Sequence, residues 1–249
     1  MSIKVAVLGA KGRMGAESVK AISAATDLEV VVQLDLGDSL DKMISSGAQV
    51  VVDFTHPDSV MANLEFAINN GISVVVGTTG FDEKKLTQIK SWLEANPKVG
   101  ALIAPNFGLG AVLMMQFAAQ ASKYFESVEI VELHHPAKAD APSGTAARTA
   151  ELINEARANV KKAAMPDATT SEIAGARGAK IGDVHVHSVR LRGLVAHQEV
   201  ILGDIGETLS IRHDSIDRTG FMPGVLLAVR NVTKNPGLTF GLENYMDLS

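Results

Sequence analysis

Several features that mark particular protein classes are missing from this chain of 249 residues. It contains no cysteine, so disulfides, thiolate zinc sites and cysteine nucleophiles are excluded. It also has no block of like charges, and its formal net charge is -5. We therefore expect no general binding to nucleic acid or to an anionic membrane surface.

Long apolar runs are missing too. No run reaches the roughly 20 residues that span a bilayer. The N-terminus enters the strand-like run Ile3-Lys4-Val5-Ala6-Val7 without the apolar region of a signal peptide. We expect a cytoplasmic protein with no membrane partner. Hydrophobic residues make up 46% and charged residues 20%, which predicts a folded chain of one or two domains with a large core.

The first hundred residues alternate between strand-like and helical patterns. The strand-like runs are nearly continuous and rich in β-branched residues, which is typical of strands buried on both faces. They cover residues 3–9, 28–35, 48–54, 72–78 and 99–106. Strands that alternate with helices predict a parallel sheet with right-handed crossovers.

The pattern changes after Phe107, where a second, α+β domain is expected. Its elements are an apolar helix, a strand, a polar loop and a further helix, at 109–125, 127–135, 136–142 and from 143 onward. Residues 169–182 are rich in glycine and alanine and predict a loop. Three alternating runs then predict consecutive antiparallel strands at 184–191, 197–203 and 207–213. A last apolar helix is expected at 219–232.

The stretch VAVLGAKGRMG, residues 5–15, predicts a strand, a glycine turn and a helix. It departs from the G-x-G-x-x-G fingerprint, because its glycines stand at 9, 12 and 15. A turn one residue longer can still bring backbone N–H groups to a pyrophosphate at a helix start. Asp35 follows 20 residues after Gly15, where an acid that binds ribose hydroxyls is expected. The alternative is a structural turn without a ligand.

The nicotinamide cofactor remains open between NADH and NADPH. Asp35 favours NADH, since a carboxylate repels a 2′-phosphate, whereas Lys11 and Arg13 on the loop could approach a phosphate. Two further strand ends, GTTG (77–80) and APNFG (104–108), carry polar groups at the edge of the sheet where ligands bind. In DFTHP (53–57), we expect Thr55 or the following Asp58 to cap a helix.

The densest polar cluster is ELHHPAKADAPSGTA, residues 132–146. Ser143 and Thr145 at a helix start, with free N–H groups, would suit a carboxylate, and Lys138 adds positive charge and a proton donor. A helix cap, a surface lysine and a loop histidine are the alternative. His185 and His187 share one strand face, but no third ligand is visible, so we expect no metal site.

Together these clusters resemble the dihydrodipicolinate reductase family, and the resemblance covers the whole chain. GAKGRMG matches the family's G-x-x-G-x-x-G loop, and DFTHP, GTTGF, APNFGLG and ELHHPAKADAPSGTA follow in the family's order. Residues 188–218 are similar to the actinobacterial branch. Two departures stand out: Pro136 replaces a frequent arginine, and residues 196–199 read Ala-His-Gln-Glu where many members have Gly-Glu-His.

The resemblance implies an α/β protein with an N-terminal Rossmann-type doubly wound sheet and an α+β substrate and oligomerisation domain with a mixed sheet. It implies a dinucleotide-binding domain of residues 1–107 and 218–249, and a substrate-binding and tetramerisation domain of residues 108–217. The expected enzyme is a homotetramer that reduces 4-hydroxy-tetrahydrodipicolinate or dihydrodipicolinate, a cyclic imine dicarboxylate, with NADH and/or NADPH in the diaminopimelate route to lysine.

The resemblance also implies site residues by position. His134 and Lys138 would be catalytic, with His134 in proton transfer and Lys138 as general acid. Substrate would contact His135, Ser143, Gly144 and Thr145. The cofactor would contact Gly9, Lys11, Gly12, Arg13, Met14, Gly15, Asp35, Gly77, Thr78, Thr79, Ala104, Pro105, Asn106 and Phe107.

Two rival functions share part of this evidence. A different Rossmann oxidoreductase would keep the glycine loop and Asp35 but would not need the cluster at 132–146. A protein that senses NADH without turnover would keep the loop and tolerate the loss of Lys138. The intact cluster favours the reductase over both.

Overall fold

The N-terminal half of the chain folds around a parallel sheet in the computed structural model, which describes residues 2–78 and 80–248. The six strands lie in the order β11-β5-β4-β3-β1-β2 and pair in parallel throughout. An order that grows outward from β1 in both directions confirms the doubly wound, Rossmann-type fold. The strands are β1 (Ile3–Leu8), β2 (Leu28–Leu34), β3 (Val50–Asp53), β4 (Ser73–Val76), β5 (Gly100–Ile103) and β11 (Gly237–Phe240).

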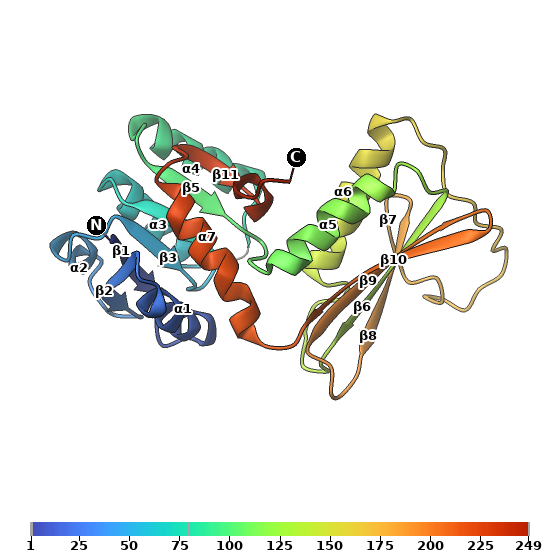
Figure 1. Cartoon of the computed structure of the whole chain (residues 1–249), viewed down its shortest axis with the longest axis horizontal. Coiled ribbons are helices and arrows are strands. Elements are labelled where there is room, and N and C mark those ends of the chain that lie inside the picture. The colour runs from blue at the N-terminus through green and yellow to red at the C-terminus, as the bar shows by residue number, and fades with distance from the viewer. Residues whose placement is uncertain (1, 79, 249) are drawn as a thin grey trace. The chain divides into compact units, whose positions relative to one another are not determined.

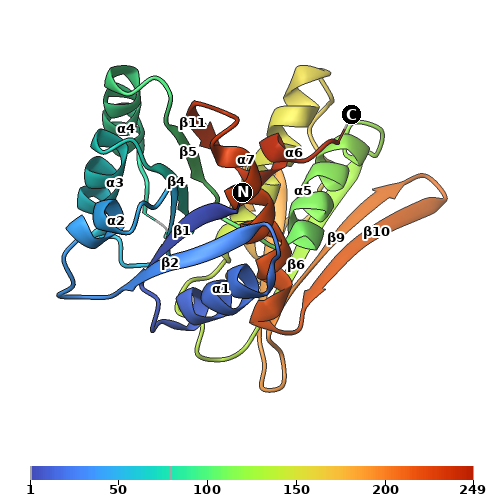
Figure 2. The same cartoon turned by 60° about the vertical axis from the view of Figure 1, so that its left-hand side comes forward.

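Helices cover both faces of this sheet, as Figures 1 and 2 show. On one face, apolar side chains of α2, α3 and α4 join a single cluster with those of the strands. On the other face, α7 packs against β3, β4, β5 and α1. Burial on both faces explains the nearly unbroken apolar runs, because every residue of β3, β4 and β5 is buried. The helices are α1 (Arg13–Ala24), α2 (Asp41–Ser45), α3 (Val60–Asn69), α4 (Glu83–Ala95) and α7 (Met222–Val232), with short 3₁₀ turns at Arg218–Phe221 and Leu242–Tyr245.

The middle of the chain forms a five-stranded mixed sheet in the order β10-β9-β6-β8-β7. Two helices contact one face of it. Inward side chains such as Ile130, Val186 and Val200 are fully or almost fully buried, and the residues between them alternate outward. The elements are α5 (Leu109–Ala121), β6 (Ser127–His134), α6 (Gly144–Asn159), β7 (Ala179–Ile181), β8 (Val184–Arg190), β9 (Ala196–Asp204) and β10 (Glu207–Ser215).

Three expectations from the sequence need correction. The runs at β8 and β9 do not pair, because β6 lies between them, parallel to β8 and antiparallel to β9. Only β9 and β10 form the expected hairpin. The predicted loop at 169–182 contains the short strand β7, and the predicted helix at 109–125 ends at Ala121. Strand β11, at the edge of the first sheet beside β5, was not expected at all.

The chain divides into two compact units. The first unit comprises residues 1–108 and 218–249, and the second comprises residues 109–217. The first unit therefore includes the C-terminal helix α7, which packs on the first sheet. Within the described ranges, no helix combines the length and the apolar character that crossing a membrane requires.

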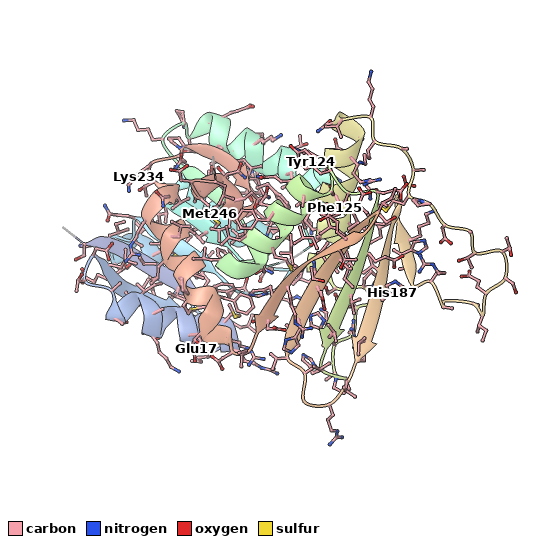
Figure 3. All side chains as sticks on the ribbon, turned by 45° about the vertical axis from the view of Figure 1, so that its right-hand side comes forward. Glu17, Tyr124, Phe125, His187, Lys234 and Met246 are labelled. Atoms are coloured by element: carbon pink, nitrogen blue, oxygen red, sulfur yellow. The ribbon has the colours of Figure 1, made fainter. Side chains whose placement is uncertain are left out.

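A buried arginine on α6 connects this helix to the segment that follows α5. Arg157 on α6 is 4% exposed. Its guanidinium donates to the carbonyls of Ser122, Phe125, Glu126 and Ala163 at 2.8–3.0 Å. Phe125, labelled in Figure 3, lies just beyond the C-terminal end of α5. These carbonyls need donors, because a buried unpaired polar group is costly.

Replacing this side chain should destabilise the protein. We expect Arg157→Ala to lower the free energy of unfolding by about 3 kcal/mol, since several buried carbonyls lose a charged donor. Urea unfolding followed by circular dichroism measures this. Arg148→Ala is the matched control on the same helix, where the arginine pairs with exposed Glu151 and should contribute less than about 1 kcal/mol. Equal losses in the two variants would contradict the role of Arg157.

Candidate functional site

The glycine loop between β1 and α1 is closed by contacts of its own backbone. Gly9 has a φ of 74°, and the Gly12 N–H donates to the Gly9 carbonyl at 2.9 Å. A Cβ on Gly15 would lie 2.0 Å from that carbonyl oxygen, and a Cβ on Gly9 would lie 2.7 Å from the Phe54 carbonyl oxygen. Helix α1 begins after Gly12, which has no side chain to cover the first N–H groups. Such a helix start suits a pyrophosphate.

Two carboxylates that follow β2 lie close to this loop, and a lysine of α2 pairs with one of them. Asp35 Oδ2 accepts the backbone N–H of Lys11 at 2.8 Å. Asp38 accepts the Asp35 N–H at 3.0 Å and pairs with Lys42 Nζ at 2.6 Å. The hydrogen bond from Lys42 lowers the pKa of Asp38. Lys11 and Arg13 themselves are exposed, and Met14 behind them is half-buried.

A buried carboxylate at the end of β3, Asp53, organises the neighbouring strand ends. Asp53 is 1% exposed. It accepts hydrogen bonds from the Thr55 N–H and hydroxyl, from the Asn63 amide and from the Thr78 hydroxyl, at 2.6–3.2 Å. Because a carboxylate only accepts, the Thr78 hydroxyl donates its hydrogen to Asp53.

The expectation that Thr55 or Asp58 caps α3 is wrong. Ser59 occupies the N-cap position. The Thr55 hydroxyl binds Asp53 at 2.6 Å, and Asp58 pairs with His56 at 3.1 Å. The Thr55 hydroxyl is one of several donors that satisfy the buried Asp53 carboxylate, since a buried charge needs hydrogen bonds.

An aromatic pair joins DFTHP to APNF, and Gly77 of GTTG packs against both rings. The rings of Phe54 and Phe107 lie edge to face, with centroids 5.7 Å apart. A Cβ on Gly77 would come within 2.1 Å of the Phe54 ring and 2.9 Å of the Phe107 ring, so only glycine fits there. This packing brings Gly77 and Phe107, predicted from separate motifs, into one place.

The remaining predicted cofactor residues differ in accessibility. Ala104 and Phe107 are almost fully buried, whereas Pro105 is exposed and Asn106 half-buried. Asn106 Oδ1 accepts the Gly108 N–H at 2.7 Å and shapes the turn. Thr79 lies outside the described residues. The first unit thus offers a glycine cradle, an acid and a polar strand edge that fit a dinucleotide.

The polar cluster at 132–146 is built around a different buried carboxylate, Glu132, which is 0% exposed. Its Oε2 binds His134 Nδ1 at 2.5 Å, and both its oxygens accept from Arg190 at 2.9 Å. Its Oε1 also accepts the Ser143 N–H at 3.2 Å. Glu132 and His134 share one face of β6, and Arg190 ends β8 directly beside His134.

The pKa values of this cluster follow from burial and charge. Burial would raise the pKa of Glu132, but hydrogen bonds from Arg190, Ser188 and His134 outweigh it and lower that pKa. For His134, burial lowers the pKa and outweighs the raising effect of Glu132, while the charges of Lys138 and Arg190 lower it further. We therefore expect an ionised Glu132 beside a neutral His134 at neutral pH.

Lys138 lies on the loop that follows, in an ion pair with Asp140 at 2.7 Å. The hydrogen bond from Lys138 lowers the pKa of Asp140, and the Gly144 N–H contributes in the same direction. The side chain of Lys138 is 21% exposed. Asp140 thus places a carboxylate against the lysine and the helix start, the two groups that we expect an anionic ligand to use.

The other predicted substrate residues are arranged as follows. Ser143 is buried and caps α6, because its hydroxyl oxygen accepts the Ala146 N–H at 3.2 Å, and its own N–H donates to Glu132. Gly144 and His135 are exposed. Thr145 is half-buried, and its carbonyl accepts the Thr149 hydroxyl at 2.7 Å. The predicted helix start is confirmed, with Ser143 as the N-cap of α6.

Comparisons with known proteins match both halves of this arrangement. The family model "Dihydrodipicolinate reductase, N-terminus" matches residues 3–107, and "Dihydrodipicolinate reductase, C-terminus" matches residues 110–246. The chain belongs to the dihydrodipicolinate reductase family. It is accordingly an oxidoreductase whose N-terminal Rossmann-type domain takes a nucleotide cofactor.

Similar proteins support this membership over the full length. The chain is 60% identical to the 4-hydroxy-tetrahydrodipicolinate reductase of Mycolicibacterium gilvum, over 99% of this chain and 100% of that protein. It is also 60% identical to the reductase of the same name from Nocardia farcinica, over 100% of both chains. The dipicolinate-bound dihydrodipicolinate reductase of Paenisporosarcina sp. TG-14 superposes with a TM-score of 0.87 at 38% identity, over 99% of this chain and 100% of that chain.

One departure from other members of the dihydrodipicolinate reductase family now has a structural context. Gln198 pairs in register with Glu132 across β6 and β9, and it donates to the Thr149 hydroxyl at 2.8 Å. The preceding His197 instead binds Asp214 at 2.6 Å. Gln198 therefore contributes a buried contact next to the cluster, whereas Pro136 is exposed on its loop.

The paired histidines of β8 contact protein groups in this reductase. His187, labelled in Figure 3, binds Glu129 Oε2 at 2.5 Å, and His185 Nδ1 lies 2.7 Å from the Arg177 carbonyl. Glu129 also pairs with the Arg177 side chain. Across residues 2–78 and 80–248, no three His, Asp or Glu side chains are grouped to hold a metal ion.

Sequence reasoning missed three residues that organise the reductase's sites: Asp53, Glu132 and Arg190. A signal was present for Asp53, because it ends an apolar strand in the same way as Asp35. Glu132 opens the quoted cluster, yet its alternating strand gives no sign of which face it takes. Arg190 lies 58 residues further along the chain, and only the pairing of β6 with β8 brings it to Glu132.

Proposed function

We propose that the chain reduces 4-hydroxy-tetrahydrodipicolinate, or its dehydrated form dihydrodipicolinate, to tetrahydrodipicolinate in the diaminopimelate route to lysine. The observation that carries this proposal is the cluster in which Glu132 joins His134 and Arg190 beside Lys138 and the start of α6. A cyclic dicarboxylate needs positive charge and N–H groups, and this cluster offers both.

The cofactor is held by the first unit in this proposal. One set of residues would bind its pyrophosphate and ribose: Gly9, Lys11, Gly12, Arg13, Met14, Gly15 and Asp35. A second set would line the nicotinamide side: Gly77, Thr78, Thr79, Ala104, Pro105, Asn106 and Phe107. When bound, a reduced nicotinamide supplies the hydride. Thr78 would orient a ligand amide through its lone pairs, since its hydrogen is used by Asp53.

Binding and protonation of the substrate belong to the second unit. Lys138 and the N–H groups at the start of α6 would attract the substrate carboxylates, with His135, Ser143, Gly144 and Thr145 around them. An incoming carboxylate would replace Asp140 at Lys138. Reduction of the imine ring leaves an enamine-like anion that must take a proton. Lys138 would act as the general acid, and His134 would take part in the transfer.

The choice between NADH and NADPH depends on the charge at Asp35. We expect Asp35→Asn to raise the ratio of kcat/KM for NADPH to that for NADH about tenfold, equivalent to about 1.4 kcal/mol. The amide keeps an acceptor for the Lys11 N–H while removing the charge that repels a 2′-phosphate. The assay follows reduced-nicotinamide absorbance, with substrate generated in place from pyruvate and aspartate semialdehyde by the preceding synthase.

Lys11→Ala removes a positive charge from the glycine loop that contacts Asp35, and it should lower the ratio of kcat/KM for NADPH to that for NADH. An unchanged ratio in Asp35→Asn would remove Asp35 from cofactor selection. The same assay tests the reaction itself, because oxidation must require both the synthase and this protein. Protein that binds NADH but oxidises neither cofactor would instead favour a nucleotide sensor.

We also propose that the enzyme is a cytoplasmic homotetramer. Helices α5 and α6 pack on one face of the second sheet. The opposite face carries half-buried apolar side chains, among them Val131 and Ile201, between charged ones such as Glu199 and Arg212. A sheet face of this mixed character suits contact with another subunit.

A further inference from the structure

We infer that Glu132 is a positioning residue that keeps the proton of neutral His134 on Nδ1 and leaves Nε2 as the nitrogen that exchanges a proton with the substrate. This inference rests on the proposal that His134 takes part in proton transfer. It concerns the state of the histidine ring, which can be measured independently of turnover.

Glu132 is ionised because of the groups that hydrogen-bond to it. Three N–H groups that cannot accept a proton donate to it: Arg190 Nη1 to Oε2, and Arg190 Nη2 and the Ser143 N–H to Oε1. The guanidinium stays charged in proteins and binds both oxygens, so it favours the carboxylate over the acid. These hydrogen bonds outweigh burial, and the pKa of Glu132 is lowered. Glu132 is therefore ionised although it is fully buried.

The ionised Glu132 determines which nitrogen of His134 carries the hydrogen. An ionised carboxylate accepts and never donates, so the 2.5 Å contact requires a hydrogen on Nδ1. In a neutral imidazole the other nitrogen, Nε2, then carries the lone pair. The groups that act on this ring come from its own strand, from the following loop and from β8: Glu132, Lys138 and Arg190. When Nε2 takes a proton from water, Glu132 stabilises the resulting cation, and this cation can give the same proton to the enamine-like anion and return to the neutral Nδ1–H form.

Arg190 makes the arrangement rigid. Its guanidinium binds both oxygens of Glu132 and also donates to the Asp140 carbonyl at 2.6 Å. The same side chain therefore connects the carboxylate under His134 to the loop that holds Lys138 and Asp140. Bidentate pairs of this kind fix geometry as well as charge. Arg190 therefore holds His134 in position relative to the loop that carries Lys138.

Glu132→Gln should reverse the tautomer. An amide group at the Oε1 position would face two donors, Arg190 Nη2 and the Ser143 N–H. At the Oε2 position it faces only one donor, Arg190 Nη1, and can donate to His134 Nδ1 if that nitrogen gives up its hydrogen. The second arrangement loses fewer hydrogen bonds. The hydrogen of neutral His134 then moves to Nε2, and the ring can no longer accept a proton there.

The experiment is a long-range ¹H–¹⁵N NMR correlation on full-length protein labelled at histidine, with the His134 signals assigned by their loss in His134→Gln. We expect an Nδ1–H tautomer in the unmodified protein and an Nε2–H tautomer in Glu132→Gln. In steady-state kinetics, Glu132→Gln should lower kcat by about 10²–10⁴-fold with little change in KM. Glu151→Gln, the same substitution at a 52% exposed side chain on α6, should change neither the tautomer nor kcat.

Different outcomes would contradict the role of Glu132 and the role of His134 in proton transfer. An Nε2–H tautomer in the unmodified protein, or an unchanged tautomer in Glu132→Gln, overturns the inference. The first of these measurements needs no variant, so it stands even if Glu132→Gln does not fold. Normal turnover in His134→Gln would instead remove His134 from proton transfer, whatever its tautomer.

Discussion

Lys138→Ala is expected to lower kcat by about 10²–10⁴-fold while leaving the dissociation constant of NADH nearly unchanged. Lys138 belongs to the second unit, whereas the glycine loop and Asp35 belong to the first. The alanine removes both the proposed proton donor and a positive charge for the substrate carboxylates. Stopped-flow or steady-state oxidation of NADH gives kcat, and fluorescence titration gives the dissociation constant.

Lys138→Arg separates the two roles of the lysine. A guanidinium keeps the positive charge but does not release a proton near neutral pH. We therefore expect Lys138→Arg to recover much of the KM for substrate but little of kcat. Lys20→Ala is the control on α1, where the lysine is 71% exposed and pairs with Glu17 one turn away. If Lys138→Ala lost NADH affinity as strongly as turnover, the assignment of a general acid would fail.

Lys138 is held in an ion pair with Asp140. The pKa of Asp140 is lowered, with the Lys138 hydrogen bond as the main cause, so Asp140 remains ionised well below neutral pH. Protonation of Asp140 in acid would release Lys138 from its partner. Because Asp140 is 57% exposed, the pair contributes little to stability and can exchange with another carboxylate.

The parallel sheet was predictable because its signal is local. The strands β3, β4 and β5 are short apolar runs in which every residue is buried, and burial of each valine contributes about 1.5–3 kcal/mol. Strand β11 has no such signal, since GLTF at the sheet edge stays partly exposed. Its pairing with β5 joins residues more than a hundred positions apart, and the sequence of neither strand records it.

The second sheet shows the same limit more clearly. Alternation correctly predicted β8, β9 and β10 as strands, yet alternation does not state which strand pairs with which. The position of β6 between β8 and β9 depends on how the strands pair in the folded protein. The pairing of β6 with β8 creates the candidate site, because it places Arg190 of β8 beside Glu132 of β6. The residue types of the site were readable from motifs, whereas its buried connections were not.

The glycine loop carries the second large effect, because its backbone leaves no room for a side chain. We expect Gly15→Ala to weaken NADH binding by about ten- to hundredfold. The added Cβ would lie 2.0 Å from the Gly9 carbonyl oxygen, 2.7 Å from the Gly9 carbonyl carbon and 2.9 Å from the Ala10 Cα. All three are backbone atoms that cannot rotate away, and such overpacking costs about 1–3 kcal/mol. The helix and the loop must separate, which withdraws the N–H groups from the pyrophosphate.

Two further glycines make the test quantitative. Gly12→Ala should weaken NADH binding less, because its Cβ would meet only the Gly9 carbonyl oxygen, at 3.0 Å. Gly203→Ala in β9 has no atom within 4 Å of the added Cβ and should bind NADH normally. Calorimetric titration measures all three dissociation constants, and circular dichroism shows whether each variant is folded. A folded Gly15→Ala protein with unchanged NADH affinity would mean that the cofactor does not approach the start of α1, and the proposed pyrophosphate site would have to be abandoned.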